Sequence, residues 1–307
     1  MAASFTAPID ASTRYCAVFG HPIRHSASPA LQNAGIAALG LNWRYIAFEV
    51  DPERLRDAIF GAKVMGFVGL NLTVPHKLLA MDMVDALDES ARSWGAVNTI
   101  RFEGCDPFGT WKSVSEFSVA PHEVRTHGFN TDADAIIQAL REDLGFEPER
   151  KRVLVLGAGG AGRVAALRLA AAGVSELSLV NRTLIRAEVV AEEIRERFGH
   201  VAVQTKYPSD KVDLLLNATS LGLQPDDPLP LDETRFQFRH ADMAYDMIYR
   251  PAETLFLRGA KAAGCRVANG IGMLLFQGAK ALELWTGKKA PISIMREALV
   301  REVYGAQ

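Results

Sequence analysis

Residues 151–173, KRVLVLGAGGAGRVAALRLAAAG, decide the fold that this sequence predicts. The apolar run VLVL is typical of a buried strand, and the alanine-rich run after it is typical of a helix. Between them lies the pattern G-x-G-x-x-G, in which the glycines permit a tight turn, a close approach to a pyrophosphate and close helix–strand packing. The stretch therefore predicts a dinucleotide site at a helix N-terminus. Its residues are Gly157, Ala158, Gly159, Gly160 and Ala161, followed by Gly162 as the packing glycine. A glycine-rich turn without a ligand is the alternative.

The end of the next predicted strand indicates which dinucleotide is bound. NAD-binding domains tend to place Asp or Glu there, where the carboxylate holds the ribose 2′-hydroxyl. This chain has no acid at that point, and its NRTLIRA stretch supplies Asn181, Arg182, Thr183 and Arg186. Two guanidinium groups suit a 2′-phosphate in charge and in geometry. We therefore expect NADP rather than NAD, although Arg186 alone is also compatible with a solvated helix residue.

Strand and helix patterns alternate on both sides of this stretch. Before it, strands are expected over 15–20, 44–50, 67–74 and 97–102, and helices over 29–39, 52–62, 76–87 and 132–144. After it, strands are expected over 176–180, 201–203, 213–219 and 243–249, and helices over 184–198, about 269–285 and 291–303. Such alternation favours an α/β fold with parallel strands. Residues 103–128, rich in Gly, Pro and Ser, instead predict a long loop or an extended hairpin.

The two alternating series predict two domains. We expect residues 133–269 to form a Rossmann domain for NADP. Residues 1–132 and 270–307 would form a second α/β domain, which is discontinuous because the last helices return to it.

Composition excludes several classes of protein. The chain has 307 residues, 49% apolar and 23% charged, with a formal net charge of −2. These values are ordinary for a globular protein with a sizeable core. No basic tract and no run of about 18 apolar residues is present, so neither a nucleic acid nor a membrane is an expected partner. Three unpatterned cysteines and a start without a secretory pattern favour the cytoplasm, and no metal site is expected.

NLTVPHK, residues 71–77, supplies candidate substrate groups in the first series. Asn71, Thr73 and Lys77 fall near one rim, where a predicted strand ends and a helix begins. A lysine at a helix start is unexpected, because the helix dipole favours anions there. The misfit hints at a functional lysine, and a solvated surface lysine is the alternative.

GHPIRHSASP, residues 20–29, supplies a second set. Ser26 and Ser28 lie one residue apart behind a predicted strand. Ser28 is expected to cap the helix that Pro29 opens. Because a helix N-terminus favours an anion, the two hydroxyls could hold one carboxylate together.

Nine motifs in sequence order resemble those of the shikimate dehydrogenase family. They are GHPIRHSASPALQN, GLNLTVPHK, GAVNTI, GFNTDADA, GAGGAGR, NRTLIRA, NATSLG, YDMIYRP and NGIGMLLFQGAKALELWTG. The resemblance extends over nearly the whole chain, from about residue 15 to 304. The resemblance implies the reversible, NADPH-dependent reduction of 3-dehydroshikimate to shikimate, on the way to chorismate and the aromatic amino acids. It also implies that residues 1–132 and 270–307 bind the substrate, with an active-site cleft between the domains.

The resemblance assigns roles residue by residue. Lys77 and Asp132 match the catalytic pair. The residues matched to the substrate are these two with Ser26, Ser28, Asn71, Thr73, Asn98, Tyr249 and Gln277. The cofactor residues added to the glycine loop and NRTLIRA are Thr219, Ser220, Met247 and Gly270. The chain departs from the family at Gln32-Asn33, where His-Asn is usual, at Ala133, where glycine is common, and in its longer segment 103–128.

Other functions remain open from sequence alone. A quinate/shikimate dehydrogenase with broader substrate or NAD use is the nearest, although such relatives often replace the second serine with threonine. A non-enzymatic nucleotide sensor should have lost Lys77 or Asp132. A dehydrogenase of the methylenetetrahydrofolate type should lack the Ser-x-Ser and NTD motifs together. We expect a homodimer, with a monomer as the alternative.

Overall fold

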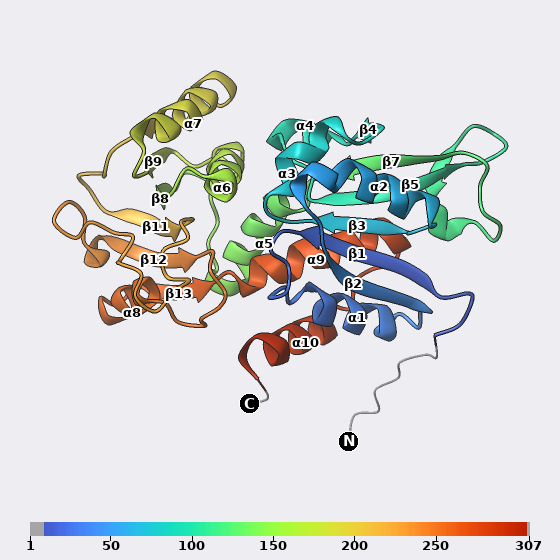
Figure 1. Cartoon of the computed structure of the whole chain (residues 1–307). Coiled ribbons are helices and arrows are strands. Elements are labelled where there is room, and N and C mark those ends of the chain that lie inside the picture. The colour runs from blue at the N-terminus through green and yellow to red at the C-terminus, as the bar shows by residue number, and fades with distance from the viewer. Residues whose placement is uncertain (1–8, 306–307) are drawn as a thin grey trace. The chain divides into compact units, whose positions relative to one another are not determined.

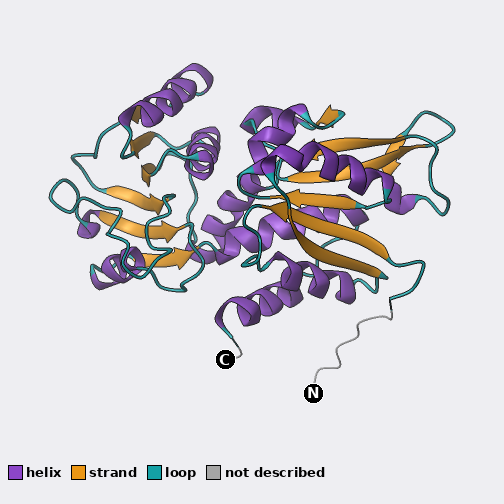
Figure 2. Ribbon diagram, in the orientation of Figure 1, coloured by secondary structure: helices purple, strands orange, loops and turns teal. Residues whose placement is uncertain are grey.

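The computed structural model describes residues 9–305, which divide into two units. One unit runs to Asp132 and resumes at Leu275, and the other comprises Ala133–Leu274. Helices and strands alternate through both, as the sequence predicts (Figures 1 and 2). The first unit has a seven-stranded sheet and the second a six-stranded sheet.

The first unit has a mixed sheet of order β2-β1-β3-β5-β7-β4, with β6 paired to β5. Its strands are β1 Arg14–Gly20, β2 Trp43–Glu49, β3 Gly69–Leu72, β4 Ala86–Leu87, β5 Thr99–Cys105, β6 Trp111–Ser113 and β7 Val124–Phe129. Its helices are α1 Ser28–Ala38, α2 Leu55–Val64, α3 His76–Leu79, α4 Glu89–Trp94, α10 Ile292–Tyr304 and the later part of α9 Ile271–Thr286. Three short 3-10 turns lie at Pro52–Arg54, Ala80–Asp82 and Val114–Glu116.

Helix α9 docks on this sheet through Trp285. The indole is fully buried, and its Nε1 donates to the carbonyl of Ile100 at 3.0 Å. Gly69 of β3 makes room for it, because a Cβ at that position would lie 2.0 Å from the indole nitrogen. On α1, Gly35 likewise packs against α9 and α10, where a Cβ would meet Leu282 at 2.7 Å. Two glycines thus let the carboxyl-terminal helices approach the amino-terminal elements.

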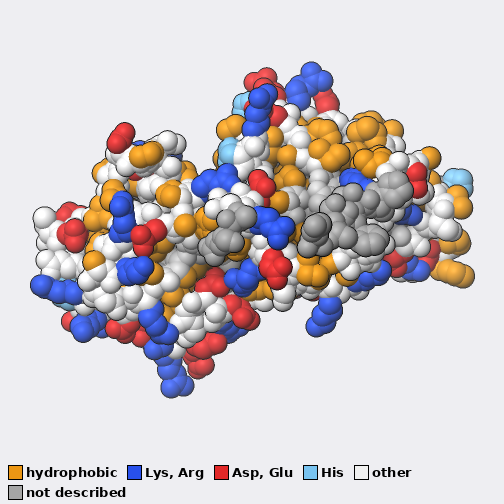
Figure 3. Space-filling view, turned by 90° about the horizontal axis from the view of Figure 1, so that it is seen from below, with side chains coloured by type: hydrophobic (Ala, Val, Ile, Leu, Met, Phe, Trp, Pro, Cys, Tyr) orange, Lys and Arg blue, Asp and Glu red, His pale blue; other side chains and the backbone are white. Residues whose placement is uncertain are grey.

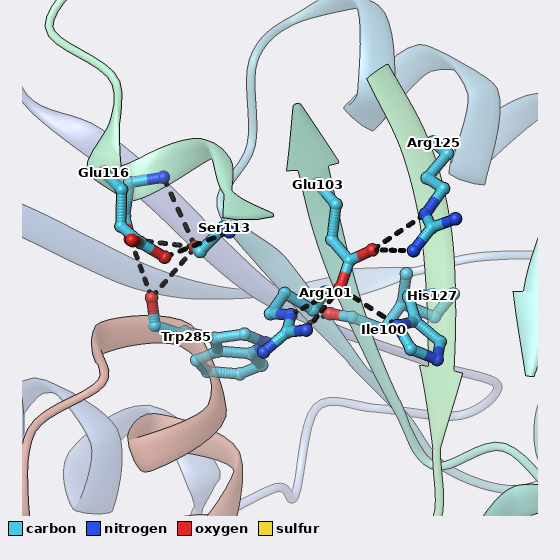
Figure 4. A network of polar contacts seen from close by, with 9 residues as sticks. Ile100, Arg101, Glu103, Ser113, Glu116, Arg125, His127 and Trp285 are labelled. Carbon is cyan, nitrogen blue, oxygen red and sulfur yellow. Dashed lines mark hydrogen bonds and ion pairs between the residues drawn. The ribbon is translucent and has the colours of Figure 1, made fainter. Parts of the chain in front are cut away.

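The prediction of a loop or hairpin over residues 103–128 was incomplete. Strand β5 continues to Cys105, β6 pairs with it antiparallel, and β7 returns antiparallel along β5. The hydroxyl of Ser113 donates to the Trp285 carbonyl (Figure 4). The hydroxyl of Ser115 donates to the same carbonyl, and the two hydrogen bonds connect this extension to the end of α9. The segment is therefore part of the sheet.

A buried carboxylate holds the strands of this extension together. Glu103 is 1% exposed and accepts hydrogen bonds from Arg101, from Arg125 at 2.8 Å and from His127 at 2.9 Å (Figure 4). Burial favours a raised pKa for Glu103, but these three hydrogen bonds outweigh it and lower the pKa to about 2. The guanidinium of Arg125 also lies over the ring of Trp111, 4.3 Å from its centroid.

The second unit has an all-parallel sheet of order β10-β9-β8-β11-β12-β13. Its strands are β8 Arg152–Leu156, β9 Glu176–Val180, β10 Ala202–Gln204, β11 Val212–Asn217, β12 Ala241–Asp246 and β13 Arg266–Asn269. Its helices are α5 Asp132–Leu144, α6 Gly160–Ala171, α7 Leu184–Arg197 and α8 Leu255–Ala262, with a 3-10 turn at Phe238–His240. Counted from β8 this is the order 3-2-1-4-5-6 of dinucleotide-binding domains. The α/β prediction is confirmed, although α8 and β13 were not expected.

Several local predictions were wrong. The sequence predicted one helix over 76–87, but α3 has four residues and is followed by a 3-10 turn and the short strand β4. The strand predicted over 67–74 spans only β3. The first sheet is not all parallel, because β5 runs antiparallel to β3 and β7 runs antiparallel to β5.

Charged side chains of both signs are interspersed over the face drawn in Figure 3. This agrees with the near-neutral net charge of −2. Within residues 9–305, no helix has both the length and the apolar character needed to cross a membrane.

Candidate active site

Lys77 and Asp132 meet in the first unit. The Lys77 Nζ lies 2.7 Å from Asp132 Oδ2, and the two side chains are 31% and 13% exposed. Lys77 belongs to α3, and its carbonyl accepts from Val97 N at 2.9 Å. Asp132 opens α5, where its backbone N–H donates to Asn130 Oδ1 at 3.1 Å. Backbone contacts thus position both ends of a partly exposed ion pair that can exchange a proton with a ligand.

The serine pair lies at the start of α1. The predicted capping role of Ser28 was wrong, because Ala27 is the N-cap residue and Ser28 is the first residue of the helix. The backbone N–H of Ser28 donates to Ser26 Oγ at 3.3 Å. Both serine residues are partly exposed, and a helix start favours an anion.

Thr73 and the two asparagines lie along the next strands. Thr73 follows β3, and its backbone N–H donates to the carbonyl of Phe19 at 3.0 Å. Asn71 lies within β3 and is 6% exposed, while Asn98, just before β5, is 1% exposed. Asn98 Oδ1 accepts from Thr131 N at 2.7 Å, so its amide nitrogen faces the Thr131 hydroxyl at 3.0 Å. Thr131 directly precedes Asp132 in the chain. Asn98 is therefore hydrogen-bonded to the residue next to the aspartate of the ion pair.

Two predicted substrate residues lie in different units. Gln277 is half-buried on α9, in the part of that helix that belongs to the first unit. Tyr249 follows β12 in the second unit, where burial raises the pKa of its hydroxyl.

The glycine loop of the second unit has the geometry that its pattern predicts. Gly157 has a φ of 104°, a region that side chains rarely adopt, and Gly162 packs so closely that a Cβ would lie 2.2 Å from the Gly157 carbonyl oxygen. At Gly159 and Gly160 an added Cβ would meet nothing within 4 Å. These two residues and Ala161 are exposed at the first turn of α6. The start of a helix of 12 residues is therefore open to an anionic ligand, which fits a dinucleotide pyrophosphate.

The NRTLIRA stretch contains two arginines and Asn181, which is hydrogen-bonded to the glycine loop. Asn181 Oδ1 accepts from Ala158 N at 3.0 Å, and Asn181 Nδ2 donates to the Thr183 carbonyl at 2.8 Å. Asn181 thus ties the glycine loop to the end of β9. Thr183 is the N-cap residue of α7, and Arg182 and Arg186 on either side of it are exposed. Neither arginine forms an ion pair with any residue that the structure describes, and two cations at a helix N-terminus suit a phosphate ligand.

The remaining cofactor candidates have mostly local partners. The Thr219 hydroxyl donates to Asn217 Oδ1 at 2.8 Å and accepts from Leu221 N at 3.1 Å, so it is used within its own turn. Ser220 is exposed. Gly270 allows a close approach, because a Cβ there would lie 2.1 Å from the Met247 carbonyl oxygen. Gly270 and Thr219 therefore shape the backbone, while Met247 and Ser220 offer side chains.

Asp246 was missed by the sequence analysis. It is fully buried at the end of β12, where Oδ1 accepts from Asn217 Nδ2 and from Ile248 N at 3.0 Å each, and Oδ2 accepts from the Thr254 hydroxyl at 2.6 Å. Burial raises the pKa of Asp246 to about 6, although these hydrogen bonds act in the opposite direction. A charged residue inside the apolar run MAYDMIY was the available signal.

Comparison with known proteins gives the family. The pattern described as the shikimate dehydrogenase substrate binding domain matches residues 18–100, and that of shikimate / quinate 5-dehydrogenase matches residues 140–221. A third, the shikimate 5'-dehydrogenase C-terminal domain, matches residues 270–300. The chain is 40% identical to the shikimate dehydrogenase (NADP(+)) of Methanopyrus kandleri, over 98% of this chain and 99% of the relative.

The chain belongs to the shikimate dehydrogenase family. It is also 41% identical to the shikimate dehydrogenase (NADP(+)) of Moorella thermoacetica, over 97% of this chain and 96% of that protein. Its fold matches the crystal structure of the Thermus thermophilus shikimate 5-dehydrogenase in complex with NADP(H) and shikimate, with a TM-score of 0.78 and 36% identity over 94% of this chain and 99% of that one. The resemblance found in the sequence motifs is thus confirmed over the whole chain.

Proposed function

We propose that this chain catalyses the reversible, NADPH-dependent reduction of 3-dehydroshikimate to shikimate. The observation that carries the proposal is the Lys77–Asp132 ion pair, 2.7 Å long and partly exposed, in a unit that also holds the two serines. The second unit supplies the open glycine loop and the exposed arginines Arg182 and Arg186. We assign the substrate to residues 1–132 and 270–307, and NADP to residues 133–269.

The residues of this chain fit both ligands. The hydroxyls of Ser26 and Ser28 would bind the substrate carboxylate at the start of α1, with Tyr249 at the same end. Asn71, Thr73, Asn98 and Gln277 would hold the ring hydroxyls. In the cofactor, the pyrophosphate would lie on the amides around Gly159 and Gly160, and the 2′-phosphate on Arg182 and Arg186. Met247 would lie against the nicotinamide.

The chemistry requires a hydride and a proton. When bound, NADPH would supply the hydride. As negative charge develops on the carbonyl oxygen, the ammonium of Lys77 stabilises it and donates a proton to it, directly or through a water. Asp132 holds the lysine in place and accepts a hydrogen bond from a neighbouring ring hydroxyl. In the oxidation of shikimate, neutral Lys77 accepts the proton from the same oxygen.

An initial-rate assay with four combinations tests the proposal. Shikimate and quinate are each offered with NADP+ and with NAD+, and kcat/KM is compared. We expect the highest value for shikimate with NADP+. A preference for quinate with NAD+ would instead identify a quinate dehydrogenase, the alternative that one matched family description includes.

Cellular context completes the proposal. We place the enzyme in the cytoplasm, in the pathway to chorismate and the aromatic amino acids, and we expect a homodimer. Sedimentation of the purified chain measures the oligomeric state. Complementation of a strain that lacks shikimate dehydrogenase measures the pathway role.

A further inference from the structure

Tyr45 on β2 is a buried tyrosine whose hydroxyl points to the substrate residues. The side chain is 2% exposed, and its ring lies 6.1 Å from that of Trp285. Its hydroxyl lies 2.8 Å from Asn71 Oδ1. Neither the sequence motifs nor the proposed mechanism gives Tyr45 a role, so this contact needs its own explanation.

The direction of the hydrogen bond follows from the neighbours of Asn71. The Asn71 amide nitrogen lies 3.3 Å from the backbone carbonyl of Asn98 and 3.0 Å from the Thr99 hydroxyl. A carbonyl only accepts hydrogen bonds, so the amide nitrogen faces Asn98 and the amide oxygen faces Tyr45. Tyr45 therefore donates its proton to Asn71. Burial raises the pKa of Tyr45 well above its usual value, so this proton is retained.

The backbone of the same tyrosine is hydrogen-bonded to α1, the helix that begins at Ser28. Asn33 of α1 accepts from Tyr45 N at 2.9 Å and donates to the Tyr45 carbonyl at 2.8 Å. The Asn33 amide also donates to the carbonyl of Pro29 at 2.9 Å, in the first turn of α1. Tyr45 thus joins the start of α1 to strand β3.

We propose that Tyr45 is a positioning residue of the substrate pocket, whose hydroxyl orients the Asn71 amide toward the bound acid. The inference deepens the proposed function and rests on it. With one lone pair of its amide oxygen committed to Tyr45, Asn71 keeps the second for a ring hydroxyl. The backbone of Tyr45 also holds Asn33, which bonds to the first turn of α1. Tyr45 acts on the substrate through Asn71 and does not touch it.

Tyr45→Phe removes only the hydroxyl and keeps the ring against Trp285. We expect kcat/KM for shikimate to fall about tenfold, mainly through a higher KM, as for the loss of one buried hydrogen bond. KM for NADP+ should not change, because the cofactor residues lie in the other unit. Tyr15→Phe on the neighbouring strand β1 is the matched control. It should leave kcat/KM and KM for shikimate and KM for NADP+ unchanged. Thermal unfolding shows whether each variant is folded.

A double-mutant cycle separates positioning from a purely structural role. In an Asn71→Ala background, Tyr45→Phe should lower kcat/KM by much less than tenfold, because its main partner is already gone. A full, additive loss in that background, equal effects on both KM values, or wild-type kinetics in Tyr45→Phe would each overturn the proposal. If the wild-type protein oxidises shikimate with NADP+ and Tyr45→Phe has the same kinetics, only the proposed role of Tyr45 fails. If the wild-type protein does not oxidise shikimate with NADP+, the proposed function and the role of Tyr45 both fail.

Discussion

The buried carboxylate of Asp246 predicts a specific pH dependence of stability. Its partners Asn217, Ile248 and Thr254 satisfy both oxygens, but burial still raises the pKa to about 6, from 3.8 for a free aspartate. The folded chain therefore binds a proton that the unfolded chain does not bind between about pH 4 and pH 6. The contribution of this group to stability is complete below the unfolded pKa and is lost as pH rises through the folded pKa.

The size of the effect follows from the two pKa values. A shift of about 2 pH units corresponds to about 3 kcal/mol between the acid and alkaline limits. Only part of this is reached in a practical range. Between pH 7.5 and pH 5, protonation of a group with a pKa of about 6 should stabilise the fold by about 1.4 kcal/mol.

Asp246→Asn isolates this contribution, because an amide resembles the protonated acid. Its nitrogen can donate to the Thr254 oxygen while its oxygen still accepts from Asn217 and Ile248. We expect the free energy of unfolding of wild type, relative to Asp246→Asn, to increase by about 1.4 kcal/mol from pH 7.5 to pH 5 in urea titrations. Asp242→Asn, on the exposed side of the same strand, is the control. A difference between wild type and Asp246→Asn that does not vary with pH would refute the reasoning.

Two further predictions concern the arginines and Glu103. Arg182→Ala combined with Arg186→Ala should raise KM for NADP+ by at least about tenfold in initial-rate assays and leave KM for NAD+ unchanged, because a 2′-phosphate loses its charge partners; an equal rise for both cofactors would contradict this. Glu103→Gln should lower the free energy of unfolding at pH 7 by about 3 kcal/mol, since the native pKa is about 2 instead of 4.5. The stability that ionised Glu103 contributes is present above the unfolded pKa and is lost as pH falls through about 2. If the difference in unfolding free energy between wild type and Glu103→Gln stays constant from pH 7 to pH 3 in urea titrations, this prediction is wrong.

Most of the second unit was predictable because its elements are encoded locally. Strands buried on both faces can appear as uninterrupted apolar runs, as VLVL does in β8. The stretch ELSLV coincides with β9 residue for residue. The glycine pattern predicts the turn between β8 and α6, because Gly157 has a positive φ and Gly162 packs against the Gly157 carbonyl, where a Cβ would not fit. Sequence reasoning here needs no knowledge of distant contacts.

The first unit departs from prediction where distant contacts decide. The antiparallel direction of β5 depends on its partners β3 and β7, which its own residues do not show. Residues 76–87 have apolar residues at helical spacing, but Leu78 and Leu79 are exposed and the chain turns to pair β4 with β7. Ala86 and Leu87 are held by that pairing in a strand, which overrides helix propensity.

Some residues of the candidate site could be found from sequence motifs, and others are evident only from the fold. The motifs supplied Lys77 and Asp132, but only the fold shows that residues 55 positions apart lie 2.7 Å from each other. Tyr45 was missed because it resembles an ordinary strand residue, and Asp246 was missed because the charge inside the apolar run MAYDMIY was not interpreted. Their significance lies in what their buried oxygens contact, which no spacing in the chain reveals.

The central claim is that Lys77 moves the proton, and turnover of Lys77→Ala tests it most directly. kcat is measured with saturating shikimate and NADP+, and shikimate affinity is measured separately by equilibrium binding. The control is Lys63→Ala, which removes a similarly exposed lysine that is ion-paired with Asp85. The account predicts that kcat falls by about 10²- to 10⁴-fold while shikimate affinity changes little. Near-wild-type turnover in Lys77→Ala would contradict it.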